Sequence, residues 1–507
     1  MSTLQDTLAA LSPATLGGIR RGIEKEGLRV LPTGGLALTP HPQALGSALT
    51  HPHITTDYSE SQLELITGAS HGVQECLDEL TALHQFVLRT LAQQGGELMW
   101  VSSMPCGLPT DETIPLARYG SSNVGRAKSV YRMGLGHRYG RRMQTISGIH
   151  YNWSMPGVSS EQYFALIRNF RRHAFVLLYL FGASPALCPC FVEGRQHSLQ
   201  RLSDEALYLP HATSLRMGRL GYQSDAQSTL TVSYNGLQGY ARSLHGALTQ
   251  PYPAYEAVGI RNPGGDYNQL GTSLLQIENE FYGTIRPKRT VKTGERPLHA
   301  LRERGVEYVE VRLMDLDPFV PVGITADTIR LLDVFLLHCL LSESPLDTPE
   351  EIAELQKNQH LTAERGREPG LELLRNGQRI ALRDWGSEVL QACAPIARAL
   401  DAAHGTDAYS AALQQSHALL FVPDQTPSAR VLRAMAQDHG NRFESFALAQ
   451  SRRAADALLA LPWSAEQQAR FEAMAEQSWA AQRAIEAADT LPFEAWRQQY
   501  MAVEGLG

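Results

Sequence analysis

Five segments in the first two-thirds of the chain alternate apolar and polar residues, and this alternation limits the fold more than any other feature. A period of two is typical of strands that bury one face and expose the other. None of the segments is a continuous run of valine and isoleucine, so the pattern favours a mainly antiparallel sheet in an α+β fold. The segments are Gly22–Val30, Glu60–Thr67, Met143–Met155, Leu274–Tyr282 and Gly305–Leu313.

Carboxylates dominate the polar faces of these expected strands. In chain order the faces carry Glu24 and Glu26; Glu60, Gln62 and Glu64, with Asp57 in the turn before them; Gln144, His150 and Asn152; Gln276, Glu278, Glu280 and Tyr282; and Tyr308, Glu310 and Arg312. For any one strand, a solvated sheet face is the ordinary explanation. Solvated faces are usually rich in lysine, however, and the whole chain contains only five.

Like charges that gather on one face repel one another unless cations neutralise them. Oxygen ligands are the ones that Mg²⁺ and Mn²⁺ prefer, and both ions tolerate one histidine among them. The five faces together therefore predict a funnel that holds divalent ions. A nucleoside triphosphate is the usual ligand of such a site.

Basic residues follow the fourth segment. The run Arg286-Pro-Lys-Arg289 is either an exposed basic turn or, beside a metal–phosphate site, a phosphate clamp. Arg312 shares a strand face with Glu310, so it is placed to stabilise charge on a transferred phosphoryl group. A second basic run, Arg138–Arg142, is expected at the surface.

Composition excludes several classes of protein. A net charge of −7 argues against a nucleic-acid-binding protein. The chain has no P-loop, no export signal and no uncharged apolar run long enough to span a membrane, so we expect a cytoplasmic protein. The pair Cys188-Pro-Cys190 lacks the second pair of ligands that a zinc site needs, and Cys106 is expected to be a buried thiol.

Helical spacing marks the remaining regions. The expected helices are Gln74–Gln94, Gln162–Phe181, Thr325–Leu341, Trp385–His404, Ser428–Ala455 and Ala465–Ala488, and residues 348–380 are expected to form a long loop. We expect a catalytic α+β region over residues 1–345 and a mainly helical region, 346–507, packed on it.

Several longer strings carry a resemblance to a known family. They are Arg21–Val30, His41–His51, Met143–Asn152, Leu180–Pro185, Ala212–Arg216, Leu275–Glu280, Ile285–Arg289 and Glu307–Arg312. On these strings the chain resembles the proteobacterial-type glutamate–cysteine ligases (γ-glutamylcysteine synthetases), of the glutamine-synthetase-like carboxylate–amine ligase superfamily. The resemblance implies a curved, mainly antiparallel sheet that forms a funnel and is wrapped by helices, with a helical C-terminal third.

The resemblance also implies an activity. These enzymes use ATP and Mg²⁺ to join the γ-carboxylate of L-glutamate to the amine of L-cysteine through γ-glutamyl phosphate, the first step of glutathione biosynthesis. It brings with it an expectation of feedback inhibition by glutathione. Three alternatives stay open: a γ-glutamyl ligase for another amine, a metal-dependent phosphohydrolase or nuclease, and a non-catalytic binding protein.

Residue roles follow from the same resemblance. The implied metal ligands are Glu24, Glu26, Asp57, Glu64, His150 and Glu310, with Glu60 as a supporting residue. Arg216 is implied to grip the glutamate α-carboxylate, and the cysteine pocket or lid is implied to contain Tyr131, Gln144, Tyr222 and Tyr282. The implied phosphate contacts are Arg132, Arg286, Lys288, Arg289 and Arg312. Asp57 or Glu64 is implied to act as the base.

Overall fold

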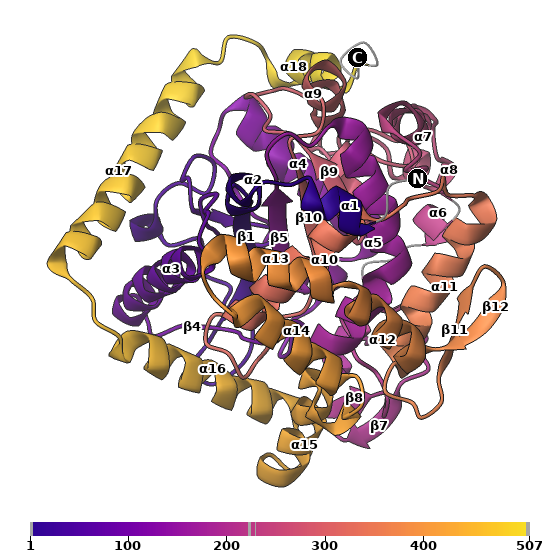
Figure 1. The fold of residues 1–507 in the computed structure, drawn as a ribbon. Coiled ribbons are helices and arrows are strands. Elements are labelled where there is room, and N and C mark those ends of the chain that lie inside the picture. The colour runs from indigo at the N-terminus through magenta and orange to yellow at the C-terminus, as the bar shows by residue number, and fades with distance from the viewer. Residues whose placement is uncertain (1–3, 222–224, 229, 503–507) are drawn as a thin grey trace.

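A seven-stranded antiparallel sheet forms the centre of the molecule. The computed structural model describes residues 4–221, 225–228 and 230–502 (Figure 1). The strand order is β2-β3-β1-β5-β10-β9, and β4 pairs with β1. The strands are β1 (Arg20–Val30), β2 (Ile54–Thr56), β3 (Gln62–Ile66), β4 (Leu98–Met99), β5 (Ile149–Ser154), β9 (Ile285–Lys288) and β10 (Tyr308–Met314). The expected fold class is confirmed.

Register places the acidic residues of neighbouring strands side by side. Glu24 of β1 lies opposite His150 of β5, and Glu26 lies opposite Glu64 of β3. Glu310 of β10 lies next to both Asn152 and Arg286 of the flanking strands. The alternation in the sequence therefore produces one continuous polar face.

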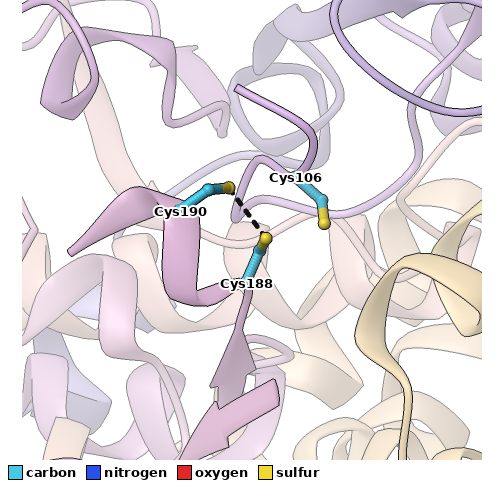
Figure 2. Close-up of side chains that lie close together, drawn as sticks. All are labelled: Cys106, Cys188 and Cys190. Atoms are coloured by element: carbon cyan, nitrogen blue, oxygen red, sulfur yellow. Dashed lines mark hydrogen bonds between the residues drawn. The ribbon is translucent and has the colours of Figure 1, made fainter. Parts of the chain in front are cut away.

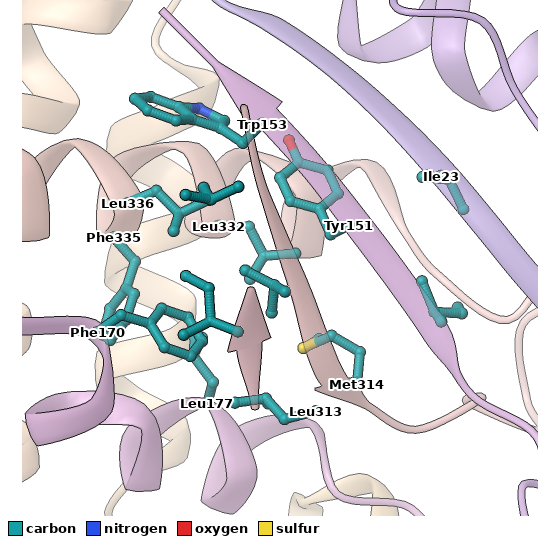
Figure 3. Packing of buried hydrophobic residues seen from close by; sticks show 14 of the residues in the cluster. Ile23, Tyr151, Trp153, Phe170, Leu177, Leu313, Met314, Leu332, Phe335 and Leu336 are labelled. Carbon is teal, nitrogen blue, oxygen red and sulfur yellow. The ribbon is translucent and has the colours of Figure 1, made fainter. Parts of the chain in front are cut away.

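Helices cover the opposite, apolar face. The first part of the chain contains helices α1 (Leu4–Ala9), α2 (Pro13–Gly17), α3 (Val73–Gln93), α4 (Asn123–Tyr139), α5 (Ser160–Phe181), α6 (Asp225–Ser228), α7 (Leu237–Thr249), α8 (Pro253–Val258), α9 (Pro297–Arg304) and α10 (Ala326–Leu341). Helices α3 and α5 contact the sheet directly, and α10 packs against α5. Figure 3 shows this core, which includes Ile23, Tyr151, Trp153, Phe170, Leu177, Leu313, Met314, Leu332, Phe335 and Leu336.

The C-terminal third is helical, as expected. Its helices are α11 (Pro349–Arg365), α12 (Leu382–Ala392), α13 (Ala394–His404), α14 (Ala408–Leu419), α15 (Pro427–Asp438), α16 (Phe443–Ala460), α17 (Ala465–Ala488) and α18 (Phe493–Met501). Helices α16 and α17, yellow in Figure 1, run along the outside of the molecule, and α18 returns to α4. The division of the chain at residue 345 stays a prediction.

Two small sheets complete the fold. One contains β6 (Ala186–Leu187), β8 (Ala206–Tyr208) and β7 (Gln200–Ser203), in that order. The other is a hairpin of β11 (Glu372–Arg375) and β12 (Gln378–Ala381). In the described part of the chain, no helix combines the length and the apolar character that crossing a membrane requires.

The prediction of a long loop over residues 348–380 is wrong, because helix α11 and the β11–β12 hairpin occupy this region. Thr348 caps α11 by accepting a hydrogen bond from the amide of Glu351, and Pro349 begins the helix. Asn358 then ties α11 to the hairpin through hydrogen bonds with the main chain of Leu374. Few residues of α11 are buried, so its apolar periodicity is weak.

The prediction of a strand over Leu274–Tyr282 is also wrong, since the only regular element in this segment is a 3₁₀ turn, η6 (Glu278–Glu280). Its two glutamates point to separate buried arginines. Glu278 pairs with Arg296 at 2.8 Å and Glu280 with Arg138 at 2.8 Å. The side chain of Arg138 is fully buried, so the expectation that its run lies at the surface is wrong at this residue.

The third expected strand is shorter than predicted. Residues Met143–Thr145 form a 3₁₀ turn, η3, and β5 begins only at Ile149. Gln144 therefore reaches the polar side of the sheet from a turn.

A buried ion pair joins the sheet to α10. Arg21 of β1 pairs with Asp333 at 3.0 Å, and both side chains are fully buried. The hydroxyl of Tyr151 donates a second hydrogen bond to Asp333 at 2.7 Å. Because a buried charge without its partner is costly, this pair fixes how α10 sits on the sheet.

We expect Asp333→Ala to lower the free energy of unfolding by about 3–5 kcal/mol, because it leaves Arg21 charged and unpaired in the core. Denaturant unfolding followed by circular dichroism measures the loss. The matched control on the same helix is Asp327→Ala, whose exposed pair with Arg330 is worth less than about 1 kcal/mol. Equal losses in the two variants would contradict the assignment.

Candidate active site

Two carboxylates and one histidine meet at the centre of the polar face. One ligand atom from each of Glu24, His150 and Glu310 lies within 4.8 Å of the others. His150 approaches Glu24 at 3.2 Å through Nδ1 and Glu26 at 3.5 Å through Nε2. Asn152 donates to the second oxygen of Glu24 at 2.8 Å. This arrangement resembles an oxygen-rich site for a divalent cation.

The remaining carboxylates increase the negative charge of the cluster. Burial raises the pKa of Glu26. Burial, together with the neighbouring Glu24 and Asp57, raises the pKa of Glu64 well above its usual value. These shifts measure the cost of gathering carboxylates in one place, and a bound cation would relieve it.

Two basic side chains contact the Glu310 carboxylate of the cluster. Lys288 and Arg312 contact separate oxygens of Glu310 at 2.9 and 2.8 Å. Although burial opposes ionisation, these two cations hold the pKa of Glu310 well below its usual value. Arg312 also lies 3.3 Å from His150, so this arginine contacts cluster residues of β5 and of its own strand, β10.

Arg216 lies beside this group, fully buried in the 3₁₀ turn η5 (Leu215–Met217). It donates to the main-chain oxygen of Arg312 at 2.8 Å and approaches Asp315 at 3.6 Å. Sequence reasoning missed Asp315, which accepts hydrogen bonds from the hydroxyls of Ser184 and Ser214. Asp315 directly follows β10, and that position was the one signal that pointed to it.

Gly148 makes room for Arg216. A Cβ atom at residue 148 would lie 2.0 Å from Nη2 of Arg216, which is far inside van der Waals contact. The amide of Gly148 also donates to Glu26 at 2.7 Å. The turn before β5 therefore positions both Arg216 and Glu26.

Aromatic residues form another wall of the site. Gln144 donates to the hydroxyl of Tyr282 at 2.7 Å, and the Tyr282 ring meets that of Tyr139 at 5.7 Å. Burial, followed by the charge of Glu280 and the nearby Tyr282, raises the pKa of Tyr131 well above its usual value. Tyr222 lies outside the described residues.

Asp57 and Arg132 lie at the rim. Asp57, in the turn between β2 and β3, has a side chain that is 38% exposed, and Arg132 of α4 approaches it at 3.8 Å. Arg132 also stacks over the ring of Tyr119 at 4.6 Å. Lys128, one helical turn earlier, interacts with both Asp57 and Glu64, and sequence reasoning did not single it out.

Three expected residues make other contacts. Arg286 donates to main-chain oxygens of the η6 turn, Asn279 and Phe281. Arg289 turns to the main chain of Arg304 at 2.8 Å, so the structure does not bring it to the cluster. Glu60 accepts hydrogen bonds from two main-chain amides, those of His41 and Arg118, which is a supporting contact.

A cavity of about 160 Å³ opens beside these side chains. Arg216, Arg312 and Tyr282 line it together with residues of α5 and α11. Small polar substrates could enter a space of this kind next to the acidic cluster.

A family model described as glutamate-cysteine ligase matches residues 6–362. The chain belongs to this family. It is 49% identical to the glutamate–cysteine ligase of Pseudomonas paraeruginosa, with 95% of this chain and 94% of that one covered. It is 48% identical to the Saccharophagus degradans enzyme, with 96% and 94% covered.

A solved structure agrees with the family. The glutamate–cysteine ligase of Francisella tularensis in complex with AMP superposes with a TM-score of 0.90 at 36% identity, covering 96% of this chain and 97% of that one. The resemblance expected from the sequence is thus confirmed. As a member of the glutamate–cysteine ligase family the chain is an enzyme, so a non-catalytic binding protein and a phosphohydrolase are excluded.

We expect Gly148→Ala to lower kcat/KM for glutamate about 30–100-fold, since the added methyl displaces Arg216 and losing one charged hydrogen-bonded contact costs about 2–3 kcal/mol. Steady-state ADP release at varied glutamate measures it. Gly246→Ala, where the Cβ would meet nothing within 4 Å, is the control and should keep full activity. Parent-like kinetics for Gly148→Ala would contradict the packing described for Arg216.

Proposed function

We propose that the polar face of the sheet binds ATP, Mg²⁺, L-glutamate and L-cysteine and forms γ-glutamylcysteine through γ-glutamyl phosphate. The observation that carries this proposal is the convergence of Glu24, His150 and Glu310 beside Arg312 and Arg216. Membership of the glutamate–cysteine ligase family supports the same reaction.

The donor set fits Mg²⁺, with Mn²⁺ as a substitute. Glu24, His150 and Glu310 would hold one ion, and Glu26, Glu64 and Asp57 are the carboxylates available to others. Burial first, and then the charges of Glu24 and Asp57, raise the pKa of Glu64, and a bound cation would oppose this shift. When bound, the ion neutralises triphosphate oxygens during phosphoryl transfer.

In the first step an oxygen of the glutamate γ-carboxylate attacks the γ-phosphorus of ATP, and the bond to ADP breaks. Arg216 would hold the α-carboxylate of glutamate, because its guanidinium is buried and fixed next to the cavity. Arg312 would stabilise the charge on the phosphoryl group during its transfer from ATP to glutamate. Phosphate contacts are proposed for Arg132, Arg286 and Lys288, and not for Arg289, which donates to the main chain of Arg304 instead.

In the second step the cysteine amine attacks the acyl carbon, phosphate leaves, and a carboxylate accepts the amine proton. Glu64 and Asp57 are the two candidates for this role. The acceptor pocket is proposed to contain Tyr131, Gln144, Tyr222 and Tyr282. Ligation of a different amine is the alternative reaction, and feedback inhibition by glutathione and a cytoplasmic location stay predictions.

Trapping the intermediate tests the proposed function. The enzyme with ATP, Mg²⁺ and glutamate, but no cysteine, should convert added hydroxylamine to γ-glutamyl hydroxamate, detected colorimetrically or by mass spectrometry. Tyr282→Ala should reduce cysteine ligation more than hydroxamate formation, because Tyr282 is placed in the acceptor pocket.

Omission of glutamate or ATP is the control for this trap. If hydroxamate fails to form, exchange of ¹⁸O between the bridging and non-bridging positions of ATP with glutamate alone tests the same step. No hydroxamate and no exchange, under conditions in which full turnover proceeds, would overturn the acyl-phosphate route.

We expect Glu310→Gln to lower kcat at least about 100-fold in saturating Mg²⁺, since it removes a full charge from the centre of the cluster. Glu307→Gln is the matched control, because Glu307 lies just before β10 and is half-exposed beside Arg289. Its turnover should stay within about twofold of the parent. Glu310→Gln turnover above a tenth of the parent rate would remove Glu310 from the proposed metal site.

Mg²⁺ binding should release protons. The ion binds the ionised carboxylate, and burial with like charge raises the pKa of Glu64, so bound protons must leave. Apparent affinity should therefore rise with pH through that raised pKa. Calorimetry in two buffers of different ionisation enthalpy measures the release, which Glu64→Gln should reduce. Identical heats for the parent enzyme in both buffers would contradict the shift.

A further inference from the structure

Three cysteines from two separate parts of the sequence meet at a second place in the molecule. Cys106 comes from the loop after β4, Cys188 follows β6, and Cys190 lies in the 3₁₀ turn η4 (Pro189–Phe191). Their sulfur atoms all lie within 4.8 Å of one another, and Cys190 donates to Cys188 at 2.7 Å. Figure 2 shows the three side chains converging from these separate segments.

The surroundings suit thiolate ligands. Cys106 is buried, whereas Cys188 and Cys190 are partly exposed, so the cluster is open to solvent on one side. Main-chain amides of Gly107 and Leu108 hydrogen-bond to the sulfurs of Cys188 and Cys190. The carboxylate of Glu444 lies near Gly107, outside the group formed by the three sulfurs.

We propose that Cys106, Cys188 and Cys190 form a binding site for a thiophilic divalent cation of the Zn²⁺ type, with water as the fourth ligand. Three thiolates and one oxygen match the tetrahedral preference of Zn²⁺. Zn–S bonds of about 2.3 Å place sulfur atoms about 3.8 Å apart. A bound ion would therefore increase the distance between the sulfurs of Cys188 and Cys190 by about 1 Å, a change that side-chain rotation can accommodate.

Soft sulfur donors also separate this site from the acidic cluster. Mg²⁺ takes oxygen ligands and has little affinity for thiolates, so the two sites select different ions. The sequence expectation of no zinc site relied on ligand spacing along the chain. It missed Cys106 because Cys106 lies 82 positions before Cys188 and only the fold brings them together.

The site bears on the catalytic centre through one short connection. Arg142 donates to the main-chain oxygen of Cys190 at 3.0 Å, and Arg142 directly precedes the η3 turn that carries Gln144. A cation held by the cysteines would tie the η4 segment and the loop of Cys106 together. We therefore expect it to stabilise the enzyme rather than to take part in the reaction.

Metal binding by the full-length enzyme tests the proposal. With a non-thiol reductant and millimolar Mg²⁺ present to saturate the acidic cluster, one Co²⁺ per chain should produce a near-ultraviolet thiolate charge-transfer band. Zn²⁺ should abolish the band, raise the melting temperature, and protect Cys106, Cys188 and Cys190 from alkylation in peptide mapping. These readouts use the parent enzyme, so they stand even where a variant fails to fold.

Variants identify the ligands. Cys188→Ser and Cys190→Ser should each weaken Zn²⁺ at least about 100-fold in a chelator competition, since each removes a thiolate, and Glu444→Gln should have a smaller effect. Cys393→Ala, whose thiol neighbours Cys339 instead, is the control and should bind Zn²⁺ like the parent. No charge-transfer band, or parent-like Zn²⁺ affinity in the Cys188→Ser/Cys190→Ser double variant, would overturn the site.

Discussion

Repulsion among carboxylates on one face of the sheet is the constraint on which the rest of the structure depends. The apolar residues of β1, β5 and β10 pack against helices, so Glu24, His150 and Glu310 point to the other side. That side then concentrates negative charge, as the raised pKa of Glu64 shows, since burial and nearby carboxylates both disfavour ionisation. Lys288 and Arg312 offset part of the charge at Glu310, and the proposed Mg²⁺ would offset more.

Main-chain geometry does as much as side-chain identity to build the site. Arg216 reaches the cluster only because residue 148 has no side chain, and Asp315 fixes its other end. On the opposite face the buried pair of Arg21 and Asp333 holds α10 against β1. The same short strands therefore support both the core and the active site, so a shift of one residue in register would reverse both faces.

The sequence predicted those parts of the fold whose signal is local. Periodicity predicts strands β1, β3 and β10 and helix α17. It also predicts that Glu24, Glu64 and Glu310 lie on the same face of the sheet. Segment Leu274–Tyr282 has the same alternation, yet its carboxylates pair with Arg138 and Arg296, and periodicity carries no information about such distant partners. The anchoring role of Asp315 and the approach of Cys106 to Cys188 were missed for the same reason.

Anomalous diffraction from crystals grown with Mn²⁺, glutamate and a non-hydrolysable ATP analogue tests the central claim most directly. The account predicts at least one manganese peak within about 2.0–2.6 Å of oxygen or nitrogen atoms of Glu24, His150 and Glu310, with the triphosphate on the same side of the sheet. It also predicts that Glu310→Gln crystals lose that peak or weaken it. A triphosphate bound elsewhere, or manganese absent from this face while the nucleotide is bound, would contradict the claim.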